Sequence, residues 1–66
     1  MREEYIRDFY NVIIGVLEYR DNGDVWVRKW PATYLGYYDC RSNVTREFPS
    51  QKVLSQGNTV VSLLYR

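Results

Sequence analysis

The residues best suited to chemistry in this 66-residue chain are arginines that lie among aromatic side chains. Aromatic rings can stack on bases, and guanidinium groups can bind phosphate. If the chain from Trp26 to Arg46 forms strands, one sheet face carries both the aromatic rings and the guanidinium groups, and turn residues flank that face. The candidate ligand-binding residues are Trp26, Arg28, Trp30, Tyr34, Tyr38, Arg41 and Arg46. They favour a compact anion such as a nucleotide, or a nucleic acid; the opposing interpretation makes the same rings the core of a small β domain.

Catalysis and metal binding find little support in the residue types. The chain has one cysteine, Cys40, and no histidine, so a nucleophilic thiol would lack its usual base and a zinc site its usual ligands. Asp39 and Glu47 could form an acid–base pair, but roles in turns suit them better. No glycine-rich phosphate loop is present. The sequence therefore predicts a protein that is not an enzyme, with no catalytic residues, no metal and no cofactor.

Length and composition indicate a small folded domain that needs support. A chain of 66 residues with 45% hydrophobic and 26% charged residues is typical of a folded protein, but its core is small. Such domains often rely on disulfides, metals or a partner subunit. A lone cysteine makes no internal disulfide, which leaves self-association as the simplest support.

The charges are uneven although the net charge is only +1. Residues 1–24 contain three arginines and six acidic residues, whereas residues 25–66 contain six basic and two acidic residues. This division is compatible with head-to-tail contact between copies, with a basic face for an anion, or with charges that mix in space. The low net charge counts against long polyanions.

No segment resembles a signal peptide or a membrane span. The first residues are charged, and the apolar run from Val12 to Leu17 is too short to cross a bilayer. We expect a soluble protein without membrane contact, located in the cytoplasm of a bacterium or of the host cell of a phage.

Alternating apolar residues and turn signals predict an all-β fold in one domain, residues 1–66. Strands are expected at 12–20, 25–30, 33–38, 44–48 and 52–55, as short antiparallel hairpins. Asn22-Gly23 indicates a two-residue hairpin turn, and Gly15 and Gly36 suit close packing of another segment. Residues 1–8 are compatible with a frayed helical turn or a loose strand, and residues 58–66 with a short helix or a strand.

An approximate internal repeat is visible in three segments. Residues 6–9, 27–30 and 45–48 each contain a β-branched residue, an arginine, a charged residue and an aromatic residue. If these segments are equivalent, Phe9, Trp30 and Phe48 are core residues, and Arg7, Arg28 and Arg46 come together near one axis. Chance similarity in a chain rich in Tyr and Arg is the alternative.

Residues 36–48, followed by Gly57-Asn58 and Leu63-Leu64, resemble the 4-fold beta flower proteins, small bacterial and phage proteins with a repeated Tyr-Asp, Asn-x-Thr and Gly-Asn pattern. The likeness covers residues 34–64 and rests on turn residues. It implies short hairpins around a pseudo-rotational centre. The chain departs from this pattern at residues 49–51 and at Leu54. The family carries no established activity, so no functional residues follow.

These patterns together favour a non-enzymatic interaction module. We expect it to self-associate as a homo-oligomer, to bind a protein partner through exposed Tyr and Trp side chains, and to derive from a phage or mobile element. The alternative is a binder of a nucleotide or nucleic acid that uses the arginine and aromatic residues named above.

Overall fold

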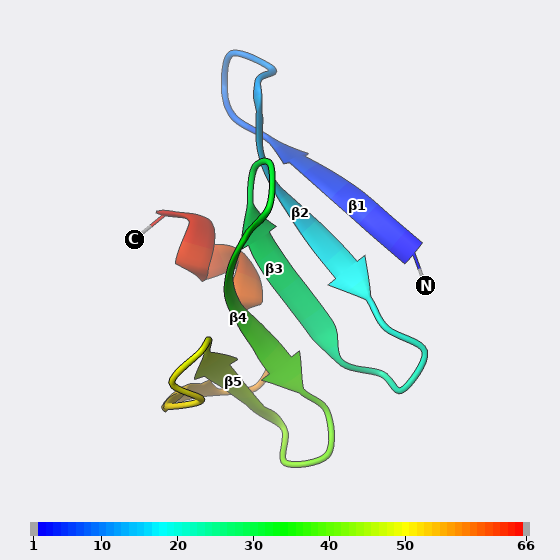
Figure 1. The fold of residues 1–66 in the computed structure, drawn as a ribbon, viewed down its shortest axis with the longest axis vertical. Helices are drawn as coiled ribbons and strands as arrows, with labels where there is room; N and C mark the ends of the chain where they lie inside the picture. Colours follow the sequence, from blue (N-terminus) through cyan, green and yellow to red (C-terminus); the bar gives the residue numbers. More distant parts are fainter. Residues whose placement is uncertain (1, 66) are drawn as a thin grey trace.

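The computed structural model describes residues 2–65 and confirms the all-β prediction. Six strands form one antiparallel sheet in chain order (Figure 1). They are β1 (Arg2–Arg7), β2 (Ile13–Tyr19), β3 (Val25–Lys29), β4 (Thr33–Asp39), β5 (Val44–Glu47) and β6 (Val53–Gln56). The one helix among the described residues is the 3₁₀ helix η1 (Val60–Tyr65), which follows β6 and packs against β2, β3 and β4.

Residues 2–7 form a strand, one of the two conformations that the sequence left open for the start of the chain. From Arg2 to Arg7 the chain pairs with β2, with Tyr5 opposite Val16. The partly buried Ile6 packs against the core, while the other β1 residues are exposed. Pairing with β2 thus turns a charged segment into an edge strand.

The β2–β3 hairpin forms as predicted, but its turn is longer than two residues. Gly23 N–H donates to the carbonyl of Arg20 over 3.1 Å, and Arg20 N–H donates to the carbonyl of Asp24 over 2.9 Å. Of the predicted pair Asn22 and Gly23, only Gly23 has a positive φ, 96°. This is the three-residue loop in which glycine takes the left-handed position, and it replaces the predicted Asn-Gly pair.

The core lies between the sheet and η1. Its buried members are Leu17, Val25, Val27, Val60 and Leu63. The start of η1 is fixed by Thr45, which is fully buried. The Thr45 hydroxyl donates to the carbonyl of Gly57 over 2.7 Å and accepts the N–H of Thr59 over 3.0 Å.

Two glycines give η1 the room to approach the sheet, as the sequence predicted. A β-carbon on Gly36 would lie 2.4 Å from the carbonyl oxygen of Arg46 and 2.6 Å from a Leu63 methyl. A β-carbon on Gly15 would meet the Leu64 methyls at 2.5 and 2.8 Å. Both positions are therefore occupied by neighbours that leave no space for a side chain.

The internal repeat is not confirmed. The strands follow one another in a single sheet, and the three aromatic residues predicted as core are exposed. Phe9 is 95% exposed, Trp30 46% and Phe48 38%, so the prediction that they form a core is wrong. Phe9 lies in a turn, and Trp30 and Phe48 directly follow strands, where their ring contacts with Tyr5 and with Trp26 and Tyr34 leave much of their surface exposed.

Candidate functional site

A bulge in β4 decides which aromatic residues share the sheet face opposite η1, here called the open face. Val27 pairs with Gly36 and Arg28 with Tyr34, so Leu35 is an extra residue in β4. The bulge reverses the alternation beyond it. Tyr37 therefore lies beside Trp26 on the open face, whereas Tyr38 packs against the core.

Tyr38 does not lie on the sheet face that alternation predicts for it. Strict alternation places it beside Tyr34, but the extra residue turns it to the η1 side. Its hydroxyl donates to the Asn43 side-chain oxygen over 2.7 Å. This bond ties the strand to the following turn, and Tyr38 does not join the other candidate residues.

Four rings form an aromatic cluster on the open face: Trp26, Tyr34, Tyr37 and Phe48. Trp26 is central, stacked on Tyr37 with ring centroids 4.4 Å apart and an angle of 16° between the planes. Its edge contacts are Tyr34 at 5.5 Å and Phe48 at 5.3 Å. Phe48 is exposed and the other three rings are partly buried, so the cluster supports itself and still presents ring surface to solvent.

A buried carboxylate, Glu18, lies next to this cluster. The residue is 3% exposed and accepts a hydrogen bond from the Tyr34 hydroxyl over 2.9 Å. Its carboxylate is also paired with Arg20 over 2.6 Å and with Arg28. Burial acts to raise the pKa of Glu18, but the hydrogen bonds from Tyr34 and Arg20 and the charges of both arginines outweigh it. The pKa of Glu18 therefore lies below its ordinary value of 4.5.

These contacts pair three arginines of the open face, Arg20, Arg28 and Arg46, with carboxylates. Arg28 also bonds Glu3 over 3.2 Å, and its Nε donates to the carbonyl of Pro31. Arg46 lies 3.5 Å from Asp39. A phosphate at this face would have to compete with these carboxylates, which lowers its affinity.

The remaining candidate residues lie at the margins. Trp30 follows β3 and contacts Tyr5 edge-on, with centroids 6.0 Å apart. Arg41 is exposed in the β4–β5 turn, where its N–H donates to Asp39 over 3.1 Å. The structure therefore brings Trp26, Arg28 and Tyr34 together on the open face. Trp30, Arg41 and Arg46 lie at the margins of this group. Tyr38 lies on the opposite face of the sheet.

The groups considered for catalysis are not arranged for it. Asp39 and Glu47 lie on opposite faces of the sheet, since Asp39 is paired with Val44 and Glu47 with Gly36. The Cys40 thiol donates to the carbonyl of Asn22 over 3.1 Å, and hydrogen bonding to Asp24 raises the pKa of Cys40. Within residues 2–65 no group of His, Cys, Asp or Glu side chains could hold a metal ion.

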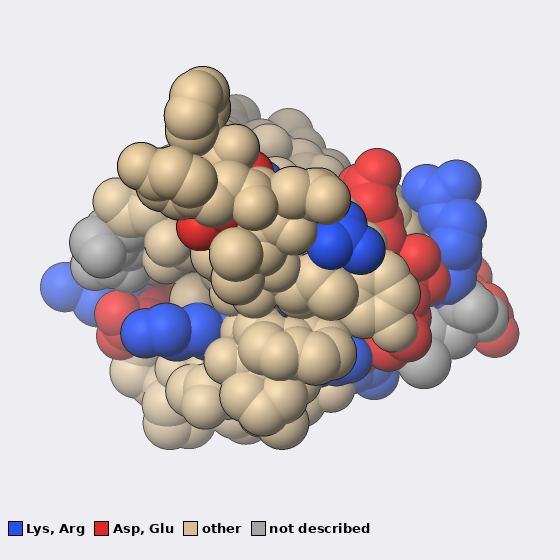
Figure 2. Space-filling view, turned by 90° about the horizontal axis from the view of Figure 1, so that it is seen from above, with Lys and Arg blue, Asp and Glu red and all other residues tan. Residues whose placement is uncertain are grey.

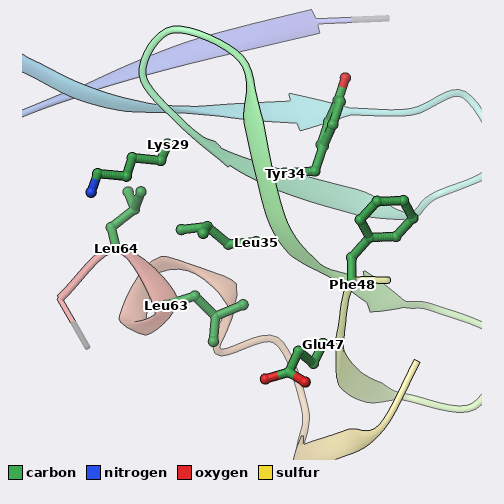
Figure 3. A pocket seen from close by; sticks show the side chains of 7 residues that line it. All are labelled: Lys29, Tyr34, Leu35, Glu47, Phe48, Leu63 and Leu64. Carbon is green, nitrogen blue, oxygen red and sulfur yellow. The ribbon is translucent and has the colours of Figure 1, made fainter. Parts of the chain in front are cut away.

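A hollow of about 340 Å³ lies where η1 meets β3 and β4 (Figure 3). Its lining is Lys29, Tyr34, Leu35, Glu47, Phe48, Leu63 and Leu64. Figure 3 shows the leucines around its centre and Lys29 and Glu47 on opposite sides. The hollow offers apolar contact and one charge of each sign, without a cluster of groups that would define a reaction.

The most exposed aromatic residues lie in the β1–β2 turn, which projects beyond the rest of the sheet (Figure 1). The Asp8 carboxylate accepts the N–H groups of Tyr10 and Val12 over 2.8 and 3.0 Å. Asn11 takes the left-handed conformation, with φ 63°. These hydrogen bonds hold the backbone of the turn in place. The side chain of Phe9 is 95% exposed and that of Tyr10 80%, so both rings face solvent.

Trp30 lies beside the start of β2, just after this turn, because its N–H donates to the carbonyl of Ile14 over 3.0 Å. We call Phe9, Tyr10, Val12 and Trp30 the aromatic apex. Figure 2 looks onto this end of the molecule and shows mainly uncharged side chains across it. Acidic and basic side chains gather on the right, the side on which β1 lies in Figure 1, and a smaller mixed group lies on the left of Figure 2.

Sequence reasoning did not select Glu18, Tyr37, Phe9 or Tyr10 as site residues. Glu18 could have been selected because it is the one charged residue in the otherwise largely apolar sequence of β2. The signal for the apex is Asp8, followed by two aromatic residues and Asn11, which is a turn pattern with bulky residues at its tip. Tyr37 carries no such signal, because the bulge that turns it depends on pairing with β3.

Comparison with protein-family models, curated proteins and solved structures found no match to this chain. Among residues 2–65 there is no helix long and apolar enough to cross a membrane.

Proposed function

We propose that this protein is a non-enzymatic interaction module that self-associates and binds a protein partner through the aromatic apex. The observation that carries the proposal is the exposure of Phe9, 95%, and Tyr10, 80%, on a turn held by Asp8. Aromatic side chains dominate the centres of protein interfaces, and burying them removes a large apolar area from water. An ordered turn loses little conformational entropy on binding.

The charges support a protein partner over a polyanion. The apex is mainly uncharged in Figure 2, and the open-face arginines Arg20, Arg28 and Arg46 are paired with carboxylates. Nucleic-acid affinity depends on cations that are available to phosphates. An apolar contact surface has no such requirement.

The test is capture of partners by immobilised protein and by a Phe9→Ser/Tyr10→Ser variant. Val53→Ser is the matched control, because Val53 is 48% exposed on β6. We expect a defined protein to bind wild type and the control, and to lose at least about tenfold in affinity for the apex variant. Equal binding to all three proteins would refute the role of the apex. Far-UV circular dichroism must show that all three remain folded.

A second candidate function is binding of a nucleotide or nucleic acid by the open face. It is favoured by the partly exposed rings of the aromatic cluster beside Arg28 and Arg46. Protein purified at low salt should then show a raised ratio of absorbance at 260 nm to that at 280 nm, and nucleotides should raise its melting temperature. A low ratio together with no thermal response would eliminate this candidate.

A further inference from the structure

The outer edge of β1 is available for pairing. In the described part of the chain β1 has a single neighbour, β2, because the strand order runs from β1 to β6. Ile6 pairs with Gly15 and Arg7 with Ile13, so the irregular residue lies in β2 and β1 keeps its regular pairing on both sides of it. An extended edge strand offers backbone N–H and carbonyl groups to another strand.

The charges along β1 are complementary to those of a second, antiparallel β1. With Tyr5 opposite Tyr5 across a two-fold axis, Glu3 faces Arg7 of the second copy and Arg7 faces its Glu3. Glu4 then faces Ile6, and Arg2 lies across from Asp8, which follows β1 and whose carboxylate holds the turn. Opposite residues in an antiparallel pair share a face, so the two Glu3–Arg7 pairs can form contacts.

Neighbouring registers are less complementary. A shift by one residue sets Arg2 opposite Arg7, or in the other direction sets Glu4 opposite Arg7 but also Glu3 opposite Asp8. A shift by two sets Glu4 opposite Glu4, or Glu4 opposite Asp8. Like charges directly opposite each other are destabilising, so the register centred on Tyr5 is the favoured one among these five.

The side chains at the centre of this register suit an interface. Tyr5 is 49% exposed and contacts Trp30, which is 46% exposed. Two such pairs would meet around the two-fold axis on the open face, with a Glu3–Arg7 pair on either side. An apolar centre with a charged rim is the usual anatomy of a protein interface.

We propose that a second copy of this chain pairs with the β1 edge in the register centred on Tyr5, giving a dimer whose sheet is continuous across both protomers. This inference rests on the self-association in the proposed function and identifies its surface. The Phe9 and Tyr10 rings of the two copies then lie at opposite ends of the dimer, free to bind partners, whereas Trp30 lies at the dimer centre.

The experiment is sedimentation velocity over a range of concentrations, with wild type, Glu3→Lys, Arg7→Glu and an equimolar mixture of the two variants. Each variant alone sets like charges opposite each other twice per dimer, so its dissociation constant should rise by roughly tenfold or more. In the mixture the introduced lysine faces the introduced glutamate, and the native Arg7 faces the native Glu3. Both contacts are attractive, so the mixture should form a heterodimer. Lys52→Glu, at an exposed residue just before β6, is the matched control and should dimerise like wild type.

The outcomes separate the inference from the function on which it rests. A wild-type protein that stays monomeric at all concentrations would overturn both self-association and the β1 interface. A wild-type dimer that Arg7→Glu leaves unchanged or strengthens would overturn the β1 interface alone. Failure of the mixture to dimerise, with both variants folded by circular dichroism, would overturn the register. Because Glu3→Lys also removes the Arg28 contact, Arg7→Glu provides the arm that leaves this internal ion pair intact.

Discussion

At the scale of single residues, Glu18 is the side chain whose environment departs most from its type. A carboxylate 3% exposed within an apolar strand is stabilised by two arginines and the Tyr34 hydroxyl. Buried ion pairs add little net stability, but removal of one partner is costly. Loss of Glu18 would therefore remove a partner from the guanidinium groups of Arg20 and Arg28 and from the Tyr34 hydroxyl.

Replacing Glu18 by Ala should lower the free energy of unfolding by about 2 kcal/mol, less than for a fully buried pair because Arg20 can reach water. Urea denaturation measures this change. Glu3→Ala is the control, since it removes the more exposed carboxylate of the same Arg28 and should cost less than about 1 kcal/mol. Equal losses in the two variants would contradict the assigned role of Glu18.

The lowered pKa of Glu18 predicts a dependence of stability on pH. A carboxylate whose folded-state pKa is depressed contributes stability above its unfolded pKa and loses it as the pH falls through the folded value. The contribution should be complete near neutral pH and decline below the ordinary value of 4.5. Urea midpoints between pH 7 and pH 3 should therefore fall less steeply for Glu18→Gln than for wild type. Parallel curves would exclude Glu18 as a source of acid sensitivity.

At the scale of elements, η1 and β5 both pack closely against β4 at Gly36. The nearest neighbour of an added β-carbon there is the backbone carbonyl of Arg46, whereas at Gly15 it is the flexible end of Leu64. A backbone atom in a sheet yields less readily than a methyl group. The two glycines should therefore differ in their tolerance of substitution.

Gly36→Ala should reduce the free energy of unfolding by about 3 kcal/mol, and Gly15→Ala by about 1 kcal/mol. Thermal and urea denaturation of the pair measure the difference. If Gly36→Ala proved the milder substitution, the close approach of β5 to β4 at this point would be wrong.

Much of the element order was predictable, because alternation and turn residues are local signals. The strands from β2 to β6 follow from such patterns, with ends displaced by at most one residue. The bulge at Leu35 was not predictable, since it arises from register with β3. That one residue determines which of Tyr37 and Tyr38 reaches the open face. β1 likewise acquires its conformation from pairing with β2.

At the scale of the whole molecule, η1 provides the second layer of the core. Val60 is 1% exposed and Leu63 7%, and both pack on the valines and leucine of β2 and β3. Without them that sheet face would present a large apolar surface to water. The small size of the domain leaves little other burial to compensate.

Removing residues 59–66 should therefore abolish cooperative unfolding, measured by near-ultraviolet circular dichroism during a thermal scan. Leu63→Ser should cost about 3 kcal/mol, because it removes a buried apolar side chain and places a hydroxyl in the core. Val61→Ser, at a residue 39% exposed, is the matched control and should be nearly neutral. A truncated protein with a sharp transition would show that the sheet is stable without η1.

The order of the strands has a consequence for the kinetics of folding. Every strand pairs with its neighbour in the sequence, so the sheet needs only short loops to close, whereas η1 must return to β2, β3 and β4. Local contacts form quickly, and distant ones pay a larger entropy of loop closure. We expect the hairpins to form in the transition state and η1 to dock afterwards. Stopped-flow measurements should then find that Leu63→Ala accelerates unfolding while the refolding rate hardly changes.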